Sequence, residues 1–264
     1  MRPTVGSLFA GIGGFDLGFE RAGFEIAWQV EIDPFCQKIL AKNFPNAERF
    51  DDVRTVGAHN LRPVDVICGG FPCQDISHSG KMAGIDGARS GLWSEYKRIL
   101  RVLRPRYALI ENVAALIGLG LERVLCDLAE IGFDAEWQTL SAAAIGAAHW
   151  RDRVWILAYP RREGIYERGE YSDAVPKGVV VPGIAGYELP WQQEISFQVL
   201  VQSRGVRAGE HLHWKAEPSM ARVADGIPER MDRIKGCGNA VVPQIPEMYA
   251  RAIKELLDAR ESCI

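Results

Sequence analysis

Two hydrophobic periodicities alternate along the first two thirds of the chain. Short runs rich in β-branched and aromatic residues predict strands, and apolar residues repeated every three or four positions predict helices. The predicted strands cover residues 4–9, 25–30, 64–69, 107–111, 136–140 and 153–158. The predicted helices cover residues 15–22, 34–43, 92–103 and 121–131. This alternation indicates an α/β fold with a doubly wound, mostly parallel sheet.

The pattern changes after Tyr159. From residue 160 to residue 221 no apolar helical stripe lasts more than two turns, which predicts short strands and loops. Helical spacing returns near the end of the chain, at Ile245, Met248, Tyr249, Ala252, Ile253, Leu256 and Leu257. We therefore predict a main domain over 1–159, a small separate region over 160–221, and a segment over 222–264 that packs back onto the main domain.

Composition narrows the class of protein. The chain has 264 residues, of which 47% are hydrophobic and 25% are charged, a balance typical of a soluble globular protein. Because no apolar run approaches roughly 18 residues and no leader pattern opens the chain, we expect a cytoplasmic protein without a membrane role. The six cysteines are thinly spread and form no Cys-x-x-Cys pair, so we expect reduced thiols and no metal site. The net charge of −3 argues against wholesale nonspecific binding to nucleic acid.

A glycine-rich turn, Phe9-Ala10-Gly11-Ile12-Gly13-Gly14, follows the first predicted strand and precedes a helix. Glycines at this place let a ligand approach the backbone beside the helix N-terminus. The turn is as compatible with a simple tight turn as with a nucleotide-like cofactor, and it does not distinguish a dinucleotide from S-adenosylmethionine.

Two acidic residues follow later segments of the same predicted sheet. Glu31 closes the second strand, where a carboxylate could accept hydrogen bonds from ribose hydroxyls, and Asp52 could accept one from an adenine amine. Taken singly, each is equally well explained as a helix N-terminal charge or a solvated loop acid. Their placement after successive segments of one sheet favours a cofactor site.

A thiol and an acid are predicted at the same edge. Cys73 lies in Gly70-Phe71-Pro72-Cys73-Gln74, directly after a buried strand, whereas Cys36, Cys68 and Cys126 fit the usual role of small buried apolar residues. Glu111 ends another strand, where it either caps the next element or faces the crevice with a raised pKa. Together they suggest a nucleophile and a proton donor on one rim.

Arginines precede the last predicted strand, in His149-Trp150-Arg151-Asp152-Arg153. Alternation along an extended chain places Arg151 and Arg153 on one face, suited to an anionic or carbonyl-bearing ligand, with Asp152 pointing away. An edge strand protected by charge would give the same pattern.

Five motifs in order resemble those of the DNA (cytosine-5)-methyltransferases. They lie at residues 7–14, 70–74, 111–113, 149–153 and 238–244, so the likeness covers nearly the whole chain except 160–221. The resemblance implies a Rossmann-like fold, S-adenosylmethionine as cofactor, and double-stranded DNA as substrate. His149 and Ala240 depart from the family's usual glutamine and serine, without removing a catalytic group.

The resemblance also implies roles for individual residues. Cys73 would attack C6 of a flipped cytosine, Glu111 would contact N3 and the amino group, and Arg151 and Arg153 would hold the base and the nucleophile loop. The implied cofactor residues are Phe9, Gly11, Gly13, Glu31, Ile32, Asp52, Val53, Pro72, Leu92, Asn239 and Val241. Region 160–221 would be a target-recognition region.

Partners and competing functions follow from the same likeness. We expect a monomeric prokaryotic or phage enzyme, either solitary or paired with a cognate restriction endonuclease. Phe71, and the absence of the tRNA-methylating branch's Cys-Phe-Thr tripeptide, favour DNA over RNA. A nicotinamide oxidoreductase would share the glycine turn but gives no reason for Cys73 beside Glu111. A DNA-binding protein without catalysis would not be expected to keep Cys73, Glu111 and both arginines.

Overall fold

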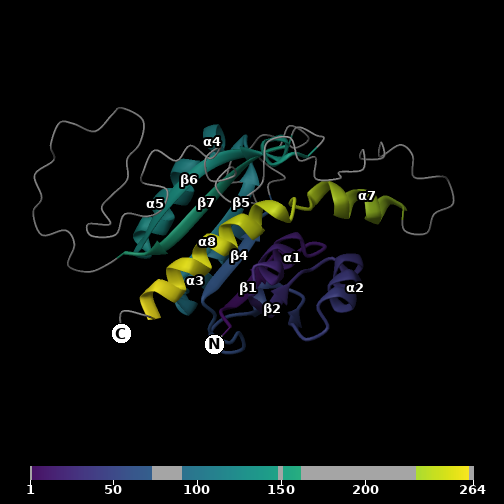
Figure 1. Cartoon of the computed structure of the whole chain (residues 1–264), viewed down its shortest axis with the longest axis horizontal. Coiled ribbons are helices and arrows are strands. Elements are labelled where there is room, and N and C mark those ends of the chain that lie inside the picture. Colours follow the sequence, from purple (N-terminus) through teal and green to yellow (C-terminus); the bar gives the residue numbers. More distant parts are fainter. Residues whose placement is uncertain (1, 73–90, 148–150, 162–229, 262–264) are drawn as a thin grey trace, which may run out of the picture.

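A computed structural model describes residues 2–72, 91–147, 151–161 and 230–261, and within them the chain forms one seven-stranded sheet (Figure 1). The strand order is β3-β2-β1-β4-β5-β7-β6. The strands are β1 (Thr4–Leu8), β2 (Glu25–Val30), β3 (Glu48–Phe50), β4 (Val66–Gly70), β5 (Tyr107–Val113), β6 (Phe133–Ser141) and β7 (Asp152–Pro160). Pairs among β1 to β5 are parallel, whereas β7 runs antiparallel to both β5 and β6.

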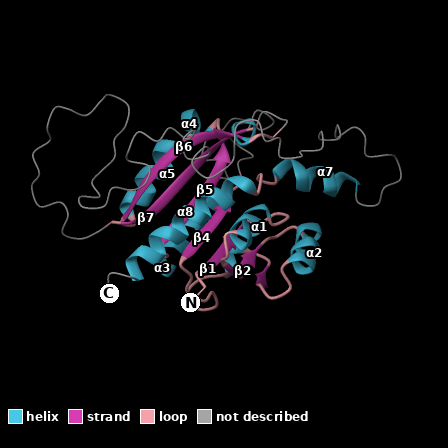
Figure 2. Cartoon of the chain, viewed as in Figure 1, coloured by secondary structure: helices cyan, strands magenta, loops and turns pink. Residues whose placement is uncertain are grey.

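Helices cover both faces of the sheet, as Figure 2 shows. They are α1 (Gly14–Arg21), α2 (Pro34–Asn43), α3 (Gly91–Leu103), α4 (Leu116–Leu119), α5 (Leu121–Glu130), α7 (Arg230–Asn239) and α8 (Gln244–Glu261), with 3-10 turns η1 (Val53–Thr55) and η2 (Ala142–Ile145). Three packed layers with crossover helices are the doubly wound architecture that the alternating pattern predicts.

Each face of the sheet has its own apolar core. One core packs α3 and α5 against the sheet, with Trp93, Tyr96 and Leu128 fully or almost fully buried. The other packs α1, α2 and α8 against the opposite face, and Phe19 and Leu40 are completely buried there. Burying such side chains contributes about 1.5–3 kcal/mol each, so the two cores hold the sheet edges in place.

Helix α8 lies against α1, although more than 200 residues separate them in the chain (Figure 1). A Cβ atom added to Gly18 of α1 would come within 2.6 Å of the Pro243 carbonyl oxygen and 2.7 Å of the Glu247 nitrogen. Only a glycine at this position allows so close an approach of the two backbones. The segment before α8 is thereby brought to the glycine turn that precedes α1.

The sheet contains one topological switch point, between β1 and β4. After β1 the chain builds outward through β2 and β3, and it then crosses to β4 on the other side of β1. Ligands of open α/β sheets bind beyond the carboxyl ends of the strands at such a point. The glycine turn after β1 and the segment after β4 both lie at this place.

The predicted fold class is confirmed, with local differences. Every predicted strand and helix has its counterpart within a few residues, but the short strand β3, the helices α4 and α7 and the reversed direction of β7 were not predicted. Cys126, expected to be buried, is exposed on α5, because it lies on the solvent side of the amphipathic helix. Nearly all of the region 160–221 lies outside the described residues. Within the described part of the chain, no helix combines the length and the hydropathy that a membrane span requires.

Candidate active site

A cleft of about 640 Å³ opens at the switch point. Its wall is built from the segments that follow β1, β2, β3 and β4, from the last residues of β5, and from the start of β7, the start of α3 and the end of α7. This volume lies within the range of about 300–1,000 Å³ that is typical of small-molecule sites.

The glycine turn forms one wall of the cleft in an unusual backbone conformation. Phe9 has φ 53° and Gly11 has φ 56°, so both backbones are in the left-handed region. A non-glycine residue such as Phe9 rarely adopts this conformation. The Gly11 amide donates a hydrogen bond to Glu31 Oε2 at 2.7 Å. A Cβ on Gly11 would meet no protein atom within 4 Å, so this backbone faces open space in the cleft.

Glu31 and its neighbours form the wall after β2. Glu31 Oε1 accepts a hydrogen bond from the Asp33 amide at 2.8 Å, and Asp33 in turn caps α2 by accepting from the Phe35 amide. Lys235 of α7 donates to Asp33 Oδ2 at 2.7 Å and holds the pKa of that carboxyl below its usual value. Ile32 is 64% exposed at the mouth, where a planar ligand could cover its apolar side chain.

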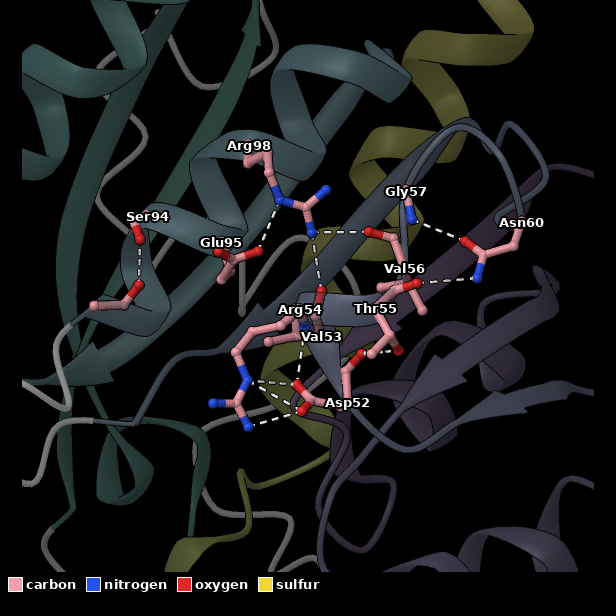
Figure 3. Close-up of polar contacts among 11 residues, drawn as sticks. Asp52, Val53, Arg54, Thr55, Val56, Gly57, Asn60, Ser94, Glu95 and Arg98 are labelled. Atoms are coloured by element: carbon pink, nitrogen blue, oxygen red, sulfur yellow. Dashed lines mark hydrogen bonds and ion pairs between the residues drawn. The ribbon is translucent and has the colours of Figure 1, made fainter.

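Asp52 sits at the start of η1, beside the cleft (Figure 3). Its Oδ1 accepts from the Arg54 amide at 2.9 Å, and the Arg54 guanidinium binds both carboxylate oxygens. These contacts with Arg54 lower the pKa of Asp52, so it presents a carboxylate to the cleft. A carboxylate oxygen has room for a second donor, which an exocyclic amine could supply.

Glu111 is the buried acid of the site. Only 8% of the residue is exposed, and burial raises the pKa of its carboxyl above the usual value, while Arg153 and Arg151 oppose that rise. Arg153 Nε lies 2.8 Å from Glu111 Oε1. The reversed direction of β7 explains this contact, because the first residues of β7 then lie beside the last residues of β5, where Val113 pairs with Arg153.

Gly70 leaves the space that Glu111 occupies. The two residues are paired across β4 and β5, and a Cβ on Gly70 would stand 2.6 Å from Glu111 Oε2. Asn112 then ties the neighbouring backbone, since its Nδ2 donates to the Phe71 carbonyl at 3.1 Å. The strand ends that carry Glu111 and precede Cys73 are therefore fastened to each other.

Arg151 reaches the end of α7 and the segment that follows it. Its guanidinium donates to the Gly238 carbonyl at 2.9 Å and to the Ala240 carbonyl at 2.7 Å. Asn239, between these two carbonyls, lines the cleft. Arg151 thus connects the strand that bears Arg153 to the late segment of the chain that completes the cleft wall.

Two other cysteines near the site are poor nucleophiles. Burial raises the pKa of Cys36, which lines the cleft, to about 12, and it raises the pKa of Cys68 well above its usual value. Both therefore remain thiols at neutral pH, and a thiolate is the form that attacks. Cys73 lies outside the described residues, directly after Pro72.

Most of the residues singled out from the sequence come together in this cleft. Its lining includes Phe9, Gly11, Glu31, Ile32, Asp52, Val53, Pro72, Leu92, Glu111, Arg151, Arg153 and Asn239. Gly13 and Val241 do not line it. Gly13 packs against the Phe44 ring, and Val241 lies behind Gly14, so both support the glycine turn from its far side.

Sequence reasoning missed four charged residues at the cleft, which are Asp33, Asp51, Arg54 and Lys235. Asp33 carries a sequence signal, because an Asp directly before Pro34 is typical of a helix start. Arg54 lies two residues after Asp52, but that spacing alone does not indicate a bidentate contact. Lys235 comes from α7, and nothing in the sequence indicates its pairing with Asp33. Among the described residues, His, Cys, Asp and Glu side chains form no cluster of three that could hold a metal ion.

The chemistry of the cleft divides into two parts. Glu31, Asp33, Asp51 and Asp52 line one part with oxygen acceptors, which suit a ligand that carries hydroxyl groups, an amine or a positive charge. Glu111, Arg151 and Arg153 line the other part with one buried acid and two cations, which suit a polar heteroaromatic group. The site can therefore hold two ligands side by side.

Comparisons with known proteins identify the family of the chain. A family model described as C-5 cytosine-specific DNA methylase matches residues 4–193, more than half of the chain. The Type II methyltransferase M2.BsuMI of Bacillus subtilis is 36% identical over 162 residues, which cover 58% of this chain and 41% of that protein. The Type II methyltransferase M.AquIA of Picosynechococcus is 33% identical over 178 residues, which cover 60% of this chain and 72% of that protein.

Solved structures give the same fold. A putative DNA modification methyltransferase encoded within an Escherichia coli prophage is 29% identical, with a TM-score of 0.51 over 60% of this chain and 47% of that one. The S. pombe Dnmt2 methyltransferase, at 23% identity and a TM-score of 0.52 over 66% of this chain and 52% of that one, supports the fold alone.

The matched part of the chain spans less than half of the Bacillus subtilis relative and of a similar Fusobacterium nucleatum methyltransferase. With its fold, its cleft and the extent of the match taken together, the chain belongs to the C-5 cytosine-specific DNA methylase family.

Proposed function

We propose that this chain transfers a methyl group from S-adenosylmethionine to C5 of a cytosine in double-stranded DNA. One observation carries the proposal: the buried acid Glu111, the acceptor Glu31 and the backbone of Gly11 all line the same cleft. An enzyme that transfers a group from a nucleoside-like cofactor to a base needs the two binding parts within one cavity. The family match and the Type II methyltransferase relatives support the same reaction.

The described residues fit the cofactor. Gly11 has open space where a side chain would stand, Ile32 exposes an apolar side chain suited to the face of an adenine, and Glu31 can accept from ribose hydroxyls. Asp52 and Val53 would hold the adenine edge, and Phe9, Pro72, Leu92 and Asn239 would complete the wall. S-adenosylmethionine supplies an electrophilic methyl group, and the acidic lining suits its positive charge.

The proposed chemistry begins with the Cys73 thiolate. A bond forms between its sulfur and C6 of cytosine, and the electron pair of the C5–C6 double bond moves so that C5 becomes nucleophilic. Glu111 donates a proton to N3 and thereby neutralises the negative charge that would develop on the ring. C5 then takes the methyl group, and S-adenosylhomocysteine is the leaving product. A base removes the C5 proton, the N3 proton returns to Glu111 and the bond between sulfur and C6 breaks, which restores both the thiolate and the aromatic ring.

Arg153 would orient Glu111 and contact the base. Because C6 of a stacked cytosine is out of reach of a thiol, the base must be flipped out of the duplex. We assign 1–159 and 222–264 to the catalytic domain and 160–221 to recognition of the target sequence. We further propose a monomeric cytoplasmic enzyme that protects host DNA, alone or beside a restriction endonuclease; the Type II methyltransferase relatives support the link to DNA modification.

Trapping with fluorinated DNA tests the proposal directly. A fluorine at C5 cannot leave as a proton does, so a duplex with 5-fluorocytosine at the target should remain bonded to the enzyme when S-adenosylmethionine is present. Peptide mapping should place the bond at Cys73. Cys73→Ser should form no adduct while still binding S-adenosylhomocysteine, whereas Cys126→Ser, a change to an exposed cysteine on α5, should react as the unchanged protein does.

The choice of DNA as substrate has its own test. Labelled S-adenosylmethionine is incubated with duplex DNA or with tRNA, and bisulfite sequencing of DNA from cells that express the gene reads the modified sequence. Methyl transfer to tRNA alone would reverse the choice of DNA. An adduct mapped to another residue, or turnover by Cys73→Ser, would contradict the proposed mechanism.

A further inference from the structure

Helix α3 fastens the turn that carries Asp52 and Val53 (Figure 3). The Arg98 guanidinium reaches from the helix to η1, and its Nη2 donates to the Val53 carbonyl at 3.0 Å and to the Val56 carbonyl at 2.8 Å. A helix end leaves carbonyl groups without intrahelical partners, and a cation placed there satisfies and stabilises them. Arg98 therefore acts on the end of η1 that lies opposite the Asp52 cap.

The guanidinium is itself held in place. Its Nε donates to Glu95 Oε2 at 2.7 Å, one helical turn earlier on α3, and the two side chains are only 32% and 24% exposed. Gly57 makes room for the group, since a Cβ there would stand 3.2 Å from Arg98 Nη1. An arginine with fixed geometry on a rigid helix is a good anchor for a short turn.

The same helix also supports other parts of the cofactor wall. Leu92, at the start of α3, lines the cleft, and Tyr96 stacks behind Phe9 with ring centroids 6.3 Å apart. The positions of Asp52 and Val53 relative to Phe9 and Leu92 are therefore fixed through α3. Within the described part of the chain, Arg98 joins α3 to η1, because its side chain donates hydrogen bonds to backbone carbonyls of the η1 turn.

We infer that Arg98 is a positioning residue for cofactor binding, which sets the Asp52–Val53 edge against the rest of the cleft. The inference rests on the proposed function, because it assumes that this edge receives the adenine of S-adenosylmethionine. Arg98 touches neither the cofactor nor the base. Its loss should therefore weaken cofactor binding and leave the methyl-transfer step itself intact.

Arg98→Met keeps an unbranched apolar stem like that of arginine and removes all of its donors. Arg101→Met is the matched control, because Arg101 is an exposed arginine on the same helix. Arg98→Lys serves as a milder variant that keeps the charge but loses the planar fork. Two measurements apply to every variant: calorimetric affinity for S-adenosylhomocysteine, and hydrogen exchange of residues 50–61 in the ligand-free protein.

For Arg98→Met we expect roughly tenfold weaker binding of S-adenosylhomocysteine, the loss that one hydrogen bond to a charged group can produce. The KM for S-adenosylmethionine should rise by a similar factor, and kcat at saturating cofactor should stay within about twofold. Exchange should become faster within residues 50–61, where the Arg54 and Thr55 amides bond to Asp52, and stay unchanged elsewhere. The affinity and the exchange rates of Arg98→Lys should fall between those of the unchanged protein and those of Arg98→Met. Arg101→Met should match the unchanged protein in both measurements.

Several results would overturn the inference. Unchanged exchange over 50–61, or unchanged affinity in both Arg98 variants, would show that η1 does not depend on Arg98. A fall in kcat at saturation, or faster exchange throughout the chain in both variants, would mean that the residue serves general stability. If the unchanged protein failed to bind S-adenosylhomocysteine, the proposed function itself would fall, and with it the role of Arg98 in cofactor binding.

Discussion

Replacing Asp16 by Asn should stabilise the protein at neutral and alkaline pH. Asp16 lies in the first turn of α1, behind the glycine turn, and is completely buried. Its Oδ1 accepts from Gln29 Nε2 at 2.9 Å, and its Oδ2 accepts from Ser7 Oγ at 3.3 Å. An asparagine can keep both contacts, because its oxygen can accept from Gln29 and the Ser7 hydroxyl can turn to accept from its amide.

The expected gain follows from the burial of the charge. Burial raises the pKa of Asp16 from 3.8 to about 6, so the charged form destabilises the fold by about 3 kcal/mol, at about 1.4 kcal/mol for each pH unit. Because the pKa of Asp16 is raised in the folded state, the unchanged protein has its full stability below pH 3.8. It loses about 3 kcal/mol of that stability as the pH rises through 6. Losing the charge near the N-terminus of α1 opposes the gain by about 0.3–1 kcal/mol. The net gain for Asp16→Asn is therefore about 2 kcal/mol at pH 8.

Thermal unfolding between pH 4 and pH 8 measures the effect. Two kcal/mol corresponds to about 5 °C in a chain of this size, so Asp16→Asn should melt about 5 °C higher at pH 8 and level with the unchanged protein near pH 4. Glu122→Gln, which alters an exposed acid in the first turn of α5, is the control and should show no such dependence on pH. A variant that melts lower than the unchanged protein at every pH would refute the reasoning, since the buried charge would then stabilise the fold.

Three further predictions concern the cleft. Gly70→Ala should displace the Glu111 carboxylate, because the new Cβ would stand 2.6 Å from its Oε2. We therefore expect kcat to fall by about a hundredfold, while calorimetry shows unchanged cofactor affinity. Arg153→Met should lower the free energy of unfolding in urea by about 3 kcal/mol by leaving Glu111 buried without its partner, and Glu111→Gln in the same chain should recover most of that loss; no recovery would refute the pairing. Arg151→Met should weaken S-adenosylhomocysteine binding at least fivefold by releasing segment 238–240, and equal affinity would contradict that role.

The periodic elements were predictable because their patterns are local. The helix at 34–43 was predicted to the residue, since it begins at a proline, which is favoured in the first turn, and apolar residues repeat along one face. The three-residue strand β3 gives no period that could be detected. The direction of β7 was equally hidden, because alternation along a strand carries no information about the neighbour beside which it lies.

The site was predictable as a set of strand ends and unpredictable as a set of contacts. Glu31 follows β2 and Glu111 lies at the end of β5, so the topology of a parallel sheet brings them to one edge. Their partners come from elsewhere: Arg98 from the middle of α3, and Lys235 from α7. Which side chain reaches which backbone depends on helix packing, and a single sequence does not specify that packing.

The pairing of α8 with α1 has a consequence for protein synthesis. The apolar side chains of α1, including Phe15 and Phe19, share their core with Ile245, Ile253 and Leu257 of α8. At about 5–20 residues per second, a ribosome needs on the order of tens of seconds to extend the chain from α1 to α8. Throughout that interval the nascent sheet has one face without its closing helix, which makes this face the natural place for a chaperone to bind.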